Sequence, residues 1–294
     1  MYATPLAIMD SFFCVLRKTD NSRIVARSSP PLALVIGGSD SGGGAGIQAD
    51  LRTLAAFGVH GLCVVCAITA QNTRGVSDIH VVPPALVAAQ LEAVFDDFRF
   101  DVVKVGMLAR PAIVRQVATV LKRHPRIKLV LDPVLVATTG AALGDDALAA
   151  ALRRHLVPRA NLLTPNWPEA NRLLGRASDC VGDRLTVAKA LRVLGARAVL
   201  LKGGHLPGAR LHDLLLTSRG QHRFSHRRID AESHGTGCTL ASAVAAGLAS
   251  GLDLESAVKQ AIDYVQRALA TSYRPGKGRL RILDHGVDSA PRSA

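Results

Sequence analysis

The chain has 294 residues, of which 48% are hydrophobic and 4% aromatic, and its formal net charge is +13. This length suits one large α/β domain with a core of mostly Ala, Val and Leu. No apolar run reaches the ~18 residues of a membrane span, and the basic residues form scattered pairs such as Arg153 and Arg154 rather than a stripe with aromatics, which argues against membrane and nucleic-acid partners.

Residues 1–30 differ in character from the rest of the chain. Charged residues such as Asp10 and Arg17 interrupt short apolar pieces there, and no convincing cleavage site follows, which argues against a secretory signal. We predict a disordered N-terminal extension over residues 1–30, or a start codon placed too far upstream. One domain is predicted over residues 31–285 and a polar tail over 286–294, with fraying expected beyond Tyr273.

The five cysteines do not form a disulfide framework, because their number is odd and their spacing scattered. Cys63 and Cys66 have the spacing of half a redox or zinc motif, but they lie within an apolar run predicted to be a buried strand. Alternation along a strand sends the two side chains to opposite faces. We therefore expect structural thiols and a cytoplasmic protein.

The first predicted strand, residues 32–36, leads through a glycine-rich loop into a helix that begins near Gly46. Open α/β sheets place ligands at such strand–loop–helix junctions. The loop lacks the Gly-Lys-Ser/Thr ending of a P-loop and does not match the dinucleotide fingerprint closely. Asp50 lies one turn into the helix, where it is either a surface charge or a ligand-binding group.

Neutral groups follow the next two predicted strands. The strand over residues 62–69 leads to Gln71, an uncharged hydrogen-bonding group that suits a neutral polar ligand better than a phosphate. The strand over residues 101–105 ends near Met107, which either fills the core or forms one wall of a flat apolar slot.

Charged groups follow the strands of the second half. Asp132 comes directly after an apolar strand, and Lys202 follows another, from where it could hold a phosphate as a point charge. Asn166 and Glu169 flank a proline-started helix. They either cap this helix or lie near magnesium, an ion that keeps several waters and takes few carboxylates.

The last part of the chain is predicted to contain a hairpin over residues 212–216 and 221–229 and helices over about 236–250 and 254–272. The glycines of residues 233–240 (SHGTGCTL) precede the first of these helices, whose free N–H groups would face an anion. Cys238 lies at the mouth of this loop, where a helix N-terminus can lower a thiol pKa and make it a base or nucleophile. The alternative is a turn with a buried structural cysteine.

The strand–helix alternation predicts an α/β fold with one doubly wound, mainly parallel sheet and helices on both faces. The polar signals gather at strand carboxyl ends and at one helix N-terminus, which indicates a single crevice.

Taken in order, these motifs resemble hydroxymethylpyrimidine/phosphomethylpyrimidine kinase, the thiamine-biosynthesis enzyme of the ribokinase-like superfamily. The resemblance runs from about Leu32 to Tyr273. Its most specific parts are residues 43–50 (GGAGIQAD) and 234–239 (HGTGCT), accompanied by 71–73 (QNT), 104–108 (KVGML), 132–134 (DPV), 164–166 (TPN) and 202–205 (KGGH).

The resemblance implies a homodimeric kinase that uses ATP and Mg²⁺. It would phosphorylate the hydroxymethyl group of 4-amino-5-hydroxymethyl-2-methylpyrimidine and then the resulting monophosphate. Carried over residue by residue, Cys238 would be the base, while the amides of Gly235, Thr236 and Gly237 would stabilise the transferring phosphoryl group.

The same resemblance assigns the remaining site residues. Asp50 and Gln71 would grip the aminopyrimidine by hydrogen bonds. The pocket would be lined by Gly38, Thr69, Met107 and Val134. Lys202 and Thr236 would meet ATP, and magnesium would be surrounded by Glu169, Asn166 and Asp132.

The chain departs from the family pattern at residues 137–140 (ATTG), where the family often has a lysine. Thr138 thus leaves the second phosphorylation open. Three other functions also stay open: a pyridoxal or pyridoxine kinase, a non-catalytic pyrimidine-binding module, and a thiol-redox protein built on Cys63 and Cys66.

Overall fold

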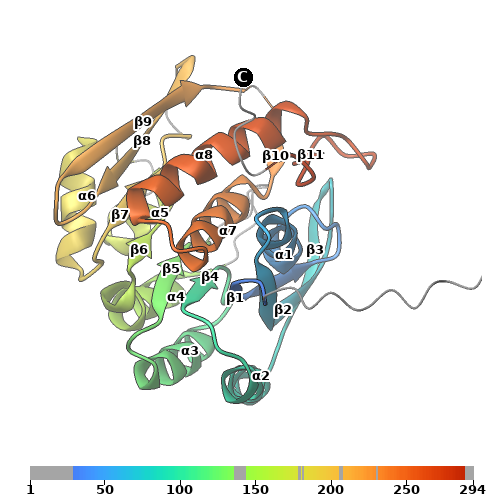
Figure 1. Cartoon of the computed structure of the whole chain (residues 1–294), viewed down its shortest axis with the longest axis vertical. Coiled ribbons are helices and arrows are strands. Elements are labelled where there is room, and N and C mark those ends of the chain that lie inside the picture. The colour runs from blue at the N-terminus through green and yellow to red at the C-terminus, as the bar shows by residue number, and fades with distance from the viewer. Residues whose placement is uncertain are drawn as a thin grey trace, which may run out of the picture.

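The computed structural model describes residues 29–135, 144–177, 180, 182–204, 208–229 and 231–288. A nine-stranded sheet runs through this part of the chain in the order β3-β2-β1-β4-β5-β6-β7-β8-β9 (Figure 1). Its strands are β1 (Leu32–Asp40), β2 (His60–Asn72), β3 (Gly75–Val81), β4 (Val102–Val105), β5 (Lys128–Leu131), β6 (Leu162–Leu163), β7 (Val199–Leu201), β8 (Arg210–Leu216) and β9 (Gln221–Arg227).

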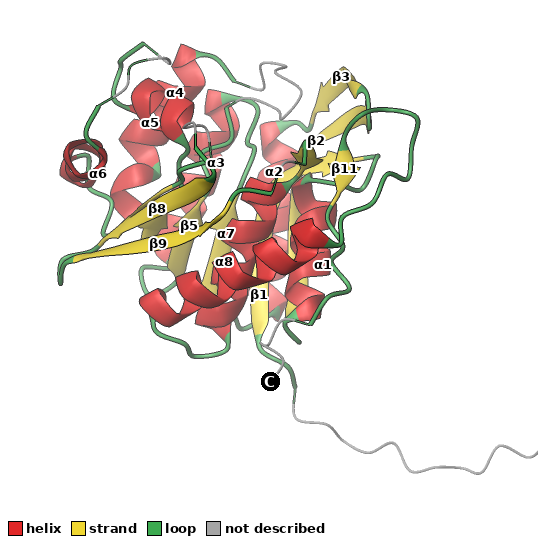
Figure 2. Ribbon diagram, turned by 90° about the horizontal axis from the view of Figure 1, so that it is seen from above, coloured by secondary structure: helices red, strands yellow, loops and turns green. Residues whose placement is uncertain are grey.

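Helices cover both faces of the sheet, as the sequence predicts. The helices are α1 (Gly46–Ala56), α2 (Pro84–Asp97), α3 (Pro111–Arg123), α4 (Asp146–His155), α5 (Trp167–Leu173), α6 (Arg184–Val193), α7 (Thr236–Ala249) and α8 (Leu254–Ala270), with a 3-10 turn at Val157–Arg159. One face packs against α1, α7 and α8 and the other against α2 to α6 (Figure 2). The doubly wound α/β fold is therefore confirmed.

The middle of the sheet is parallel and its edges are antiparallel. Neighbouring strands from β2 through β7 pair in parallel, whereas β3 pairs antiparallel with β2 and the β8–β9 hairpin completes the other edge. The hairpin was predicted, but β3 was not, because its sequence GVSDIHV has polar residues at its centre and none of its residues is fully buried. The carboxyl ends of the parallel strands consequently meet at one edge, where α/β proteins bind ligands.

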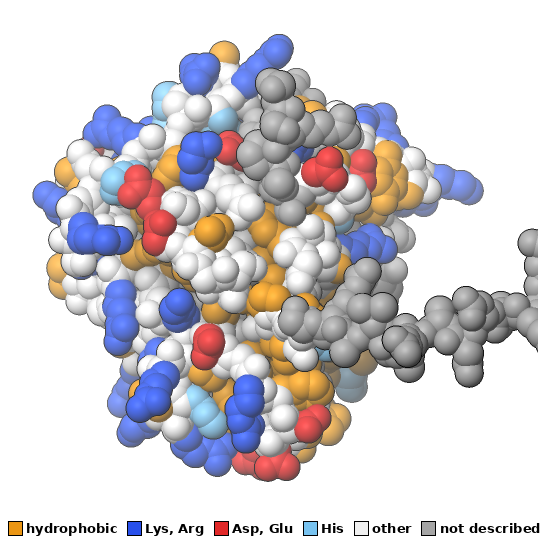
Figure 3. Space-filling view, in the orientation of Figure 1, with side chains coloured by type: hydrophobic (Ala, Val, Ile, Leu, Met, Phe, Trp, Pro, Cys, Tyr) orange, Lys and Arg blue, Asp and Glu red, His pale blue; other side chains and the backbone are white. Residues whose placement is uncertain are grey.

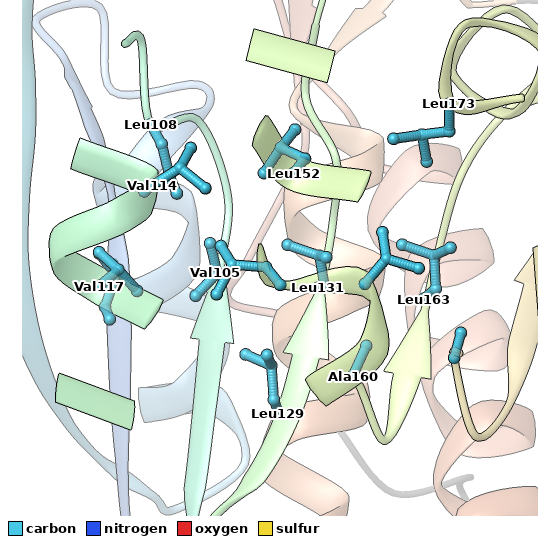
Figure 4. Packing of buried hydrophobic residues seen from close by; sticks show 14 of the residues in the cluster. Val105, Leu108, Val114, Val117, Leu129, Leu131, Leu152, Ala160, Leu163 and Leu173 are labelled. Carbon is cyan, nitrogen blue, oxygen red and sulfur yellow. The ribbon is translucent and has the colours of Figure 1, made fainter. Parts of the chain in front are cut away.

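The continuous apolar runs of the central strands are explained by burial on both faces. Along β1, Leu34 and Ile36 point into one hydrophobic cluster, while Ala33 and Val35 point into the other. Figure 4 shows the first cluster, in which Val105 and Leu131 from adjacent strands meet the side chains of the covering helices. This two-sided packing holds the strand ends rigidly beneath the loops.

The C-terminal segment corrects the prediction that the chain frays beyond Tyr273. Strands β10 (Ser233–His234) and β11 (Arg281–Ile282) pair in parallel, and Tyr273 forms a bridge with Ile282. Leu280, Ile282 and Leu283 are buried. These few apolar residues stand in a polar segment and show no helical or strand pattern, so local periodicity did not indicate that they hold the segment against the loop before α7.

The structure also bears on the predictions for the two cysteines, for membrane-spanning helices and for the distribution of basic residues. Cys63 is exposed and Cys66 buried, which agrees with their opposite orientation on β2, but the prediction of a buried strand was wrong at Cys63 because one face of this part of β2 is exposed. No helix in the described ranges has the length and hydrophobicity needed to span a bilayer. On the face seen in Figure 3, lysines and arginines are scattered rather than gathered in one stripe. Residues 1–28, residue 138 and residues 289–294 lie outside the described residues.

Candidate active site

A cavity of about 580 Å³ opens where the carboxyl ends of the parallel strands meet the N-terminus of α7. It brings together every residue that the sequence analysis assigned to the site. These residues are Gly38, Asp50, Thr69, Gln71, Met107, Asp132, Val134, Asn166, Glu169, Lys202, Gly235, Thr236, Gly237 and Cys238. The prediction that these residues lie around one cavity is therefore confirmed, whereas the role of each residue stays a prediction.

Two glycine-rich loops form the wall of this cavity near α7. Gly235 is the N-cap residue of α7 and has a left-handed backbone with φ of 82°, and a Cβ at this position would lie 2.0 Å from the carbonyl oxygen of Gly44. Gly46 has φ of 58°, and a Cβ there would lie 2.3 Å from the carbonyl oxygen of Gly38. Only glycine fits such close backbone approaches. Within the described residues no side chain caps α7, so its first N–H groups, which belong to residues that line the cavity, have no side-chain acceptor.

Lys202 lies beside this loop and joins two carboxylates. Its Nζ is 2.9 Å from Asp132 Oδ1 and 3.7 Å from Glu169 Oε2. A Cβ placed on Gly237 would be 3.3 Å from the same Nζ. Although burial disfavours the ammonium, Asp132 and Glu169 hold the pKa of Lys202 well above its usual range. A permanent positive charge therefore stands next to the N-terminus of α7.

The two carboxylates near Lys202 differ in their protonation. Burial raises the pKa of Glu169 to about 7, with Lys202 opposing that shift. Burial acts on Asp132 too, but Lys202 and Lys104 outweigh it and lower the pKa of Asp132. Asp132 is thus the ionised partner of Lys202, while Glu169 holds or releases a proton near neutrality.

Asn166 and Glu169 also form a capping box at the start of α5. The amide of Glu169 donates to Asn166 Oδ1 and the amide of Asn166 donates to Glu169 Oε2, both at 2.9 Å. The capping alternative is therefore confirmed for both residues, and the buried Glu169 still faces the cavity. No three His, Cys, Asp or Glu side chains gather as a metal cluster within the described residues. Asp132 and Glu169 nevertheless fit magnesium that brings phosphate oxygens and waters as its other ligands.

The expectation that the N-terminus of α7 lowers the pKa of Cys238 was wrong. Burial raises the pKa of this thiol to about 11, and the nearby Asp50 and Asp132 add to the shift, while Lys104 opposes it. The positive end of α7 does not overcome the loss of solvation. The thiol is consequently protonated at neutral pH in the free protein.

Asp50 is buried rather than exposed, and its carboxylate is already held by the protein. Lys104 Nζ lies 2.8 and 2.9 Å from its two oxygens, and Ser242 Oγ donates to Oδ1 at 2.8 Å. The side chains of Lys104 and Asp50 are both 1% exposed. Since Oδ2 accepts from Lys104 alone among these partners, one of its lone pairs can still receive a ligand donor.

The opposite end of the cavity is neutral and narrow. A Cβ on Gly38 would lie 3.2 Å from Met107 Sδ, so glycine keeps a slot open against the methionine. Thr69 Oγ1 lies 2.9 Å from the carbonyl oxygen of Ser39 and 3.1 Å from Gln71 Oε1. Together with Val134, these residues offer a flat apolar space with hydrogen-bonding groups at its rim.

The sequence profile of the family described as phosphomethylpyrimidine kinase matches residues 40–282. The chain belongs to the phosphomethylpyrimidine kinase family. The match covers both glycine-rich loops and every predicted site residue except Gly38.

Two curated relatives show how the family sequence is used in other proteins. A thiamine biosynthesis bifunctional protein ThiED from Geobacter sulfurreducens is 48% identical over 83% of this chain, which spans 50% of that protein. A hydroxymethylpyrimidine/phosphomethylpyrimidine kinase from Rhizobium meliloti is 46% identical over 84% of this chain and 94% of its own length. The chain thus spans about half of the bifunctional relative and nearly all of the other.

A solved relative has the same fold. The pyridoxal kinase from Staphylococcus aureus, in complex with AMP-PCP and pyridoxal, superimposes with a TM-score of 0.80 at 28% identity and covers 88% of this chain and 94% of its own. The fold is therefore shared between kinases whose names give different substrates.

Several cavity residues of this phosphomethylpyrimidine kinase family member were not singled out from the sequence. Lys104, Asp40 and His234 face the site, and α8 contributes one apolar side of it through Ile262 and Val265. His234 and Lys104 stand within motifs that carry the family resemblance, which was the available signal. Asp40 had the same signal, because residues 37–40 (GGSD) also belong to the motifs of this resemblance.

Proposed function

We propose that this protein transfers a phosphoryl group from ATP to the hydroxymethyl group of 4-amino-5-hydroxymethyl-2-methylpyrimidine and then to the monophosphate so formed. The observation that carries this proposal is the cavity itself. Its neutral end has the slot between Gly38 and Met107, and its charged end has Lys202 beside the open N-terminus of α7. A flat ring and a polyphosphate suit these two ends.

In the proposed reaction the substrate hydroxyl oxygen attacks the γ-phosphorus of ATP, and the bond from that phosphorus to the β–γ bridging oxygen breaks to release ADP. The amides of Gly235, Thr236 and Gly237 and the ammonium of Lys202 stabilise the charge on the transferring group. Phosphoryl transfer passes through a loose transition state, so positioning and charge stabilisation contribute more than proton removal.

The hydroxyl proton goes to Cys238 in this scheme. A thiolate is needed to accept it, and the raised pKa of Cys238 makes the thiolate a minor species at neutral pH. Lys104 favours that minor species through its charge. Only the fraction of the protein that carries the Cys238 thiolate can therefore accept the hydroxyl proton, so the rate should follow that fraction.

The nucleotide base is proposed to lie against the apolar side that α8 supplies, where Ile262 and Val265 line the same cavity as Lys202. Asp132 and Glu169 would hold magnesium, which neutralises phosphate charge when it is bound. A homodimer in the cytoplasm and the second phosphorylation stay predictions, and Thr138 lies outside the described residues.

The alternative with a specific observation in its favour is a pyridoxal kinase, because the Staphylococcus aureus enzyme with that fold was solved with pyridoxal. The 46% identity to the Rhizobium meliloti enzyme favours the aminopyrimidine. A competition assay separates the two: purified protein is given Mg-ATP and equal concentrations of both compounds, and the phosphorylated products are quantified. We expect pyrimidine phosphate in large excess. Pyridoxal phosphate as the main product would contradict the proposal, and ligand binding without either product would favour the non-catalytic module.

A further inference from the structure

Asp40 and His234 form a buried pair at the rim of the neutral end of the cavity. His234 Nε2 lies 3.2 Å from Asp40 Oδ2, and their side chains are 8% and 2% exposed. The same His234 nitrogen contacts Gln71 Nε2. The pair therefore contacts the side-chain amide of Gln71, which binds the pyrimidine in the proposed function.

Asp40 can only be an acceptor in this arrangement. Its carboxylate accepts from the amides of Gly42, Gly44 and Ala45 at 2.8, 3.0 and 2.8 Å. Burial disfavours its charge, but the hydrogen bond from His234 and these amides outweigh burial and lower the pKa of Asp40. An ionised carboxylate has no proton to give, so the proton between Asp40 and His234 lies on Nε2 of the histidine.

The other ring nitrogen supports the same tautomer. Nδ1 of His234 is buried and has no hydrogen-bond partner among the described residues. A proton there would be a buried donor without an acceptor, which is more costly than an unused lone pair. His234 therefore carries a proton on Nε2, facing Asp40 and Gln71.

A count of donors then decides the orientation of the Gln71 side-chain amide. Its oxygen and nitrogen are assigned from their hydrogen-bond partners, and a half-turn of the amide exchanges the two atoms. With the NH₂ group toward His234, two N–H donors would face each other. Thr69 would also need its single hydroxyl proton for both Ser39 and Gln71. With the carbonyl oxygen toward His234, every contact has a donor: the single Nε2 proton of His234 is shared between Asp40 and Gln71, Gln71 donates to Thr69, and Thr69 donates to Ser39.

We propose that His234, held by Asp40, is a positioning residue that turns the Gln71 carbonyl away from the ligand and leaves one Gln71 N–H free to bind it. The site then selects an aromatic ring that presents a nitrogen acceptor to Gln71. This inference rests on the proposed function for its choice of ligand, but the hydrogen-bond order can be measured without any turnover.

The direct measurement is nitrogen NMR of histidine-labelled full-length protein near pH 7.5. The protein has 10 histidines, and the spectrum of H234Q identifies the His234 signals by their loss. We expect a proton on Nε2, and a His234 with Nε2 unprotonated would overturn the inference. A pyrimidine that is not phosphorylated would instead contradict the proposed function and leave this result standing.

Steady-state kinetics test the consequence for the ligand. H234L removes the donor and should raise KM for the aminopyrimidine about tenfold, the usual effect of one lost hydrogen bond, with little change in kcat. H234Q retains an N–H near the Nε2 position and should recover most of that loss. H222Q is the matched control, because His222 pairs with Glu255 at the surface. A loss in kcat alone, or equal losses in H234L and H234Q, would show a merely structural role and overturn the proposal.

Ligand analogues complete the test. Two analogues are used, each with one ring nitrogen replaced by C–H. One of them should bind the natural protein about tenfold more weakly than the parent, and that difference should shrink in H234L. Equal binding of both analogues and the parent by the natural protein would contradict donation from Gln71.

Discussion

The two ends of the cavity differ in the side chains that line them, one being charged and the other neutral. At the α7 end, Lys202, Asp132 and Glu169 form a charged cluster beside open backbone N–H groups. At the other end, Thr69, Gln71 and Met107 present neutral hydrogen bonds and apolar surface. Charge placed by the fold stabilises a phosphoryl group, whereas a neutral slot selects by shape and hydrogen bonding. If this contrast holds, changes at the first end should lower kcat and changes at the second should raise KM.

The largest effect is expected from Gly235→Ala. The new Cβ would collide with the carbonyl oxygen of Gly44 and displace the amides before α7. Loss of such amide donors costs about 10²–10³ in kcat. Gly251→Ala is the matched control, because Gly251 has a similar φ of 88° but nothing within 4 Å. Both variants should lose about 1–2 kcal/mol of stability for the left-handed backbone. Gly235→Ala should lose more, because its Cβ also collides with the Gly44 backbone, and only this variant should lose activity. Equal activities in steady-state assays would contradict the role of the loop.

Cys238→Ala should lower kcat about 10²-fold, the usual scale for a general base. The pH dependence is a sharper test. Because the pKa of Cys238 is raised to about 11, the thiolate fraction and the rate should increase as pH rises from 7 toward 10. The slope should vanish in the variant.

Cys63→Ser is the control for that experiment, since Cys63 is an exposed thiol outside the cavity. It should keep both the rate and the pH slope of the natural protein. A rate that depends on Cys63 but not on Cys238 would revive the thiol-redox alternative.

Glu169→Gln should change the pH dependence of stability. The pKa of Glu169 is raised from 4.5 to about 7, so the folded state holds its proton more tightly than the unfolded state. Its contribution to the free energy of unfolding is fully present below about pH 4.5 and is lost as pH rises through 7. Denaturant unfolding between these pH values should show a shallower fall in the variant. The control Glu92→Gln removes an exposed carboxylate paired with Arg123 and should leave the slope unchanged.

Met107→Ala should have the smallest effect and should act at the neutral end alone. Removing one wall of the slot weakens contact with the ring, and we expect KM for the pyrimidine to rise up to about tenfold, as for the loss of a well-packed apolar side chain. KM for ATP and kcat should change little. Leu86→Ala truncates an exposed side chain and serves as control. A fall in kcat with an unchanged KM for the pyrimidine would break the contrast between the two ends.

The sequence predicted the fold and the location of the site because both depend on local patterns. Apolar runs that end in polar residues marked the strands, and α7 and α8 were placed to within two residues at each end. Residues at strand carboxyl ends converge whenever the sheet is parallel. Asp132, Gln71 and Lys202 could therefore be expected to meet without knowledge of their distances.

What the sequence missed depends on contacts between distant segments. The pairing of Asp50 with Lys104 and of Asp40 with His234 joins residues far apart in the chain. The pKa of Cys238 follows from burial, which a helix N-terminus alone does not indicate. The return of Ile282 to the loop before α7 rests on a few apolar side chains in a polar segment. Local periodicity contains none of this information.

The most direct test of the central claim is a phosphorus NMR time course of the purified protein with Mg-ATP and 4-amino-5-hydroxymethyl-2-methylpyrimidine. The account predicts a pyrimidine monophosphate that appears first and is then converted to the diphosphate as ATP is consumed. A monophosphate that accumulates without conversion would restrict the proposal to its first step and direct attention to residues 137–140. The absence of any pyrimidine phosphate, with pyridoxal phosphorylated under the same conditions, would contradict the account.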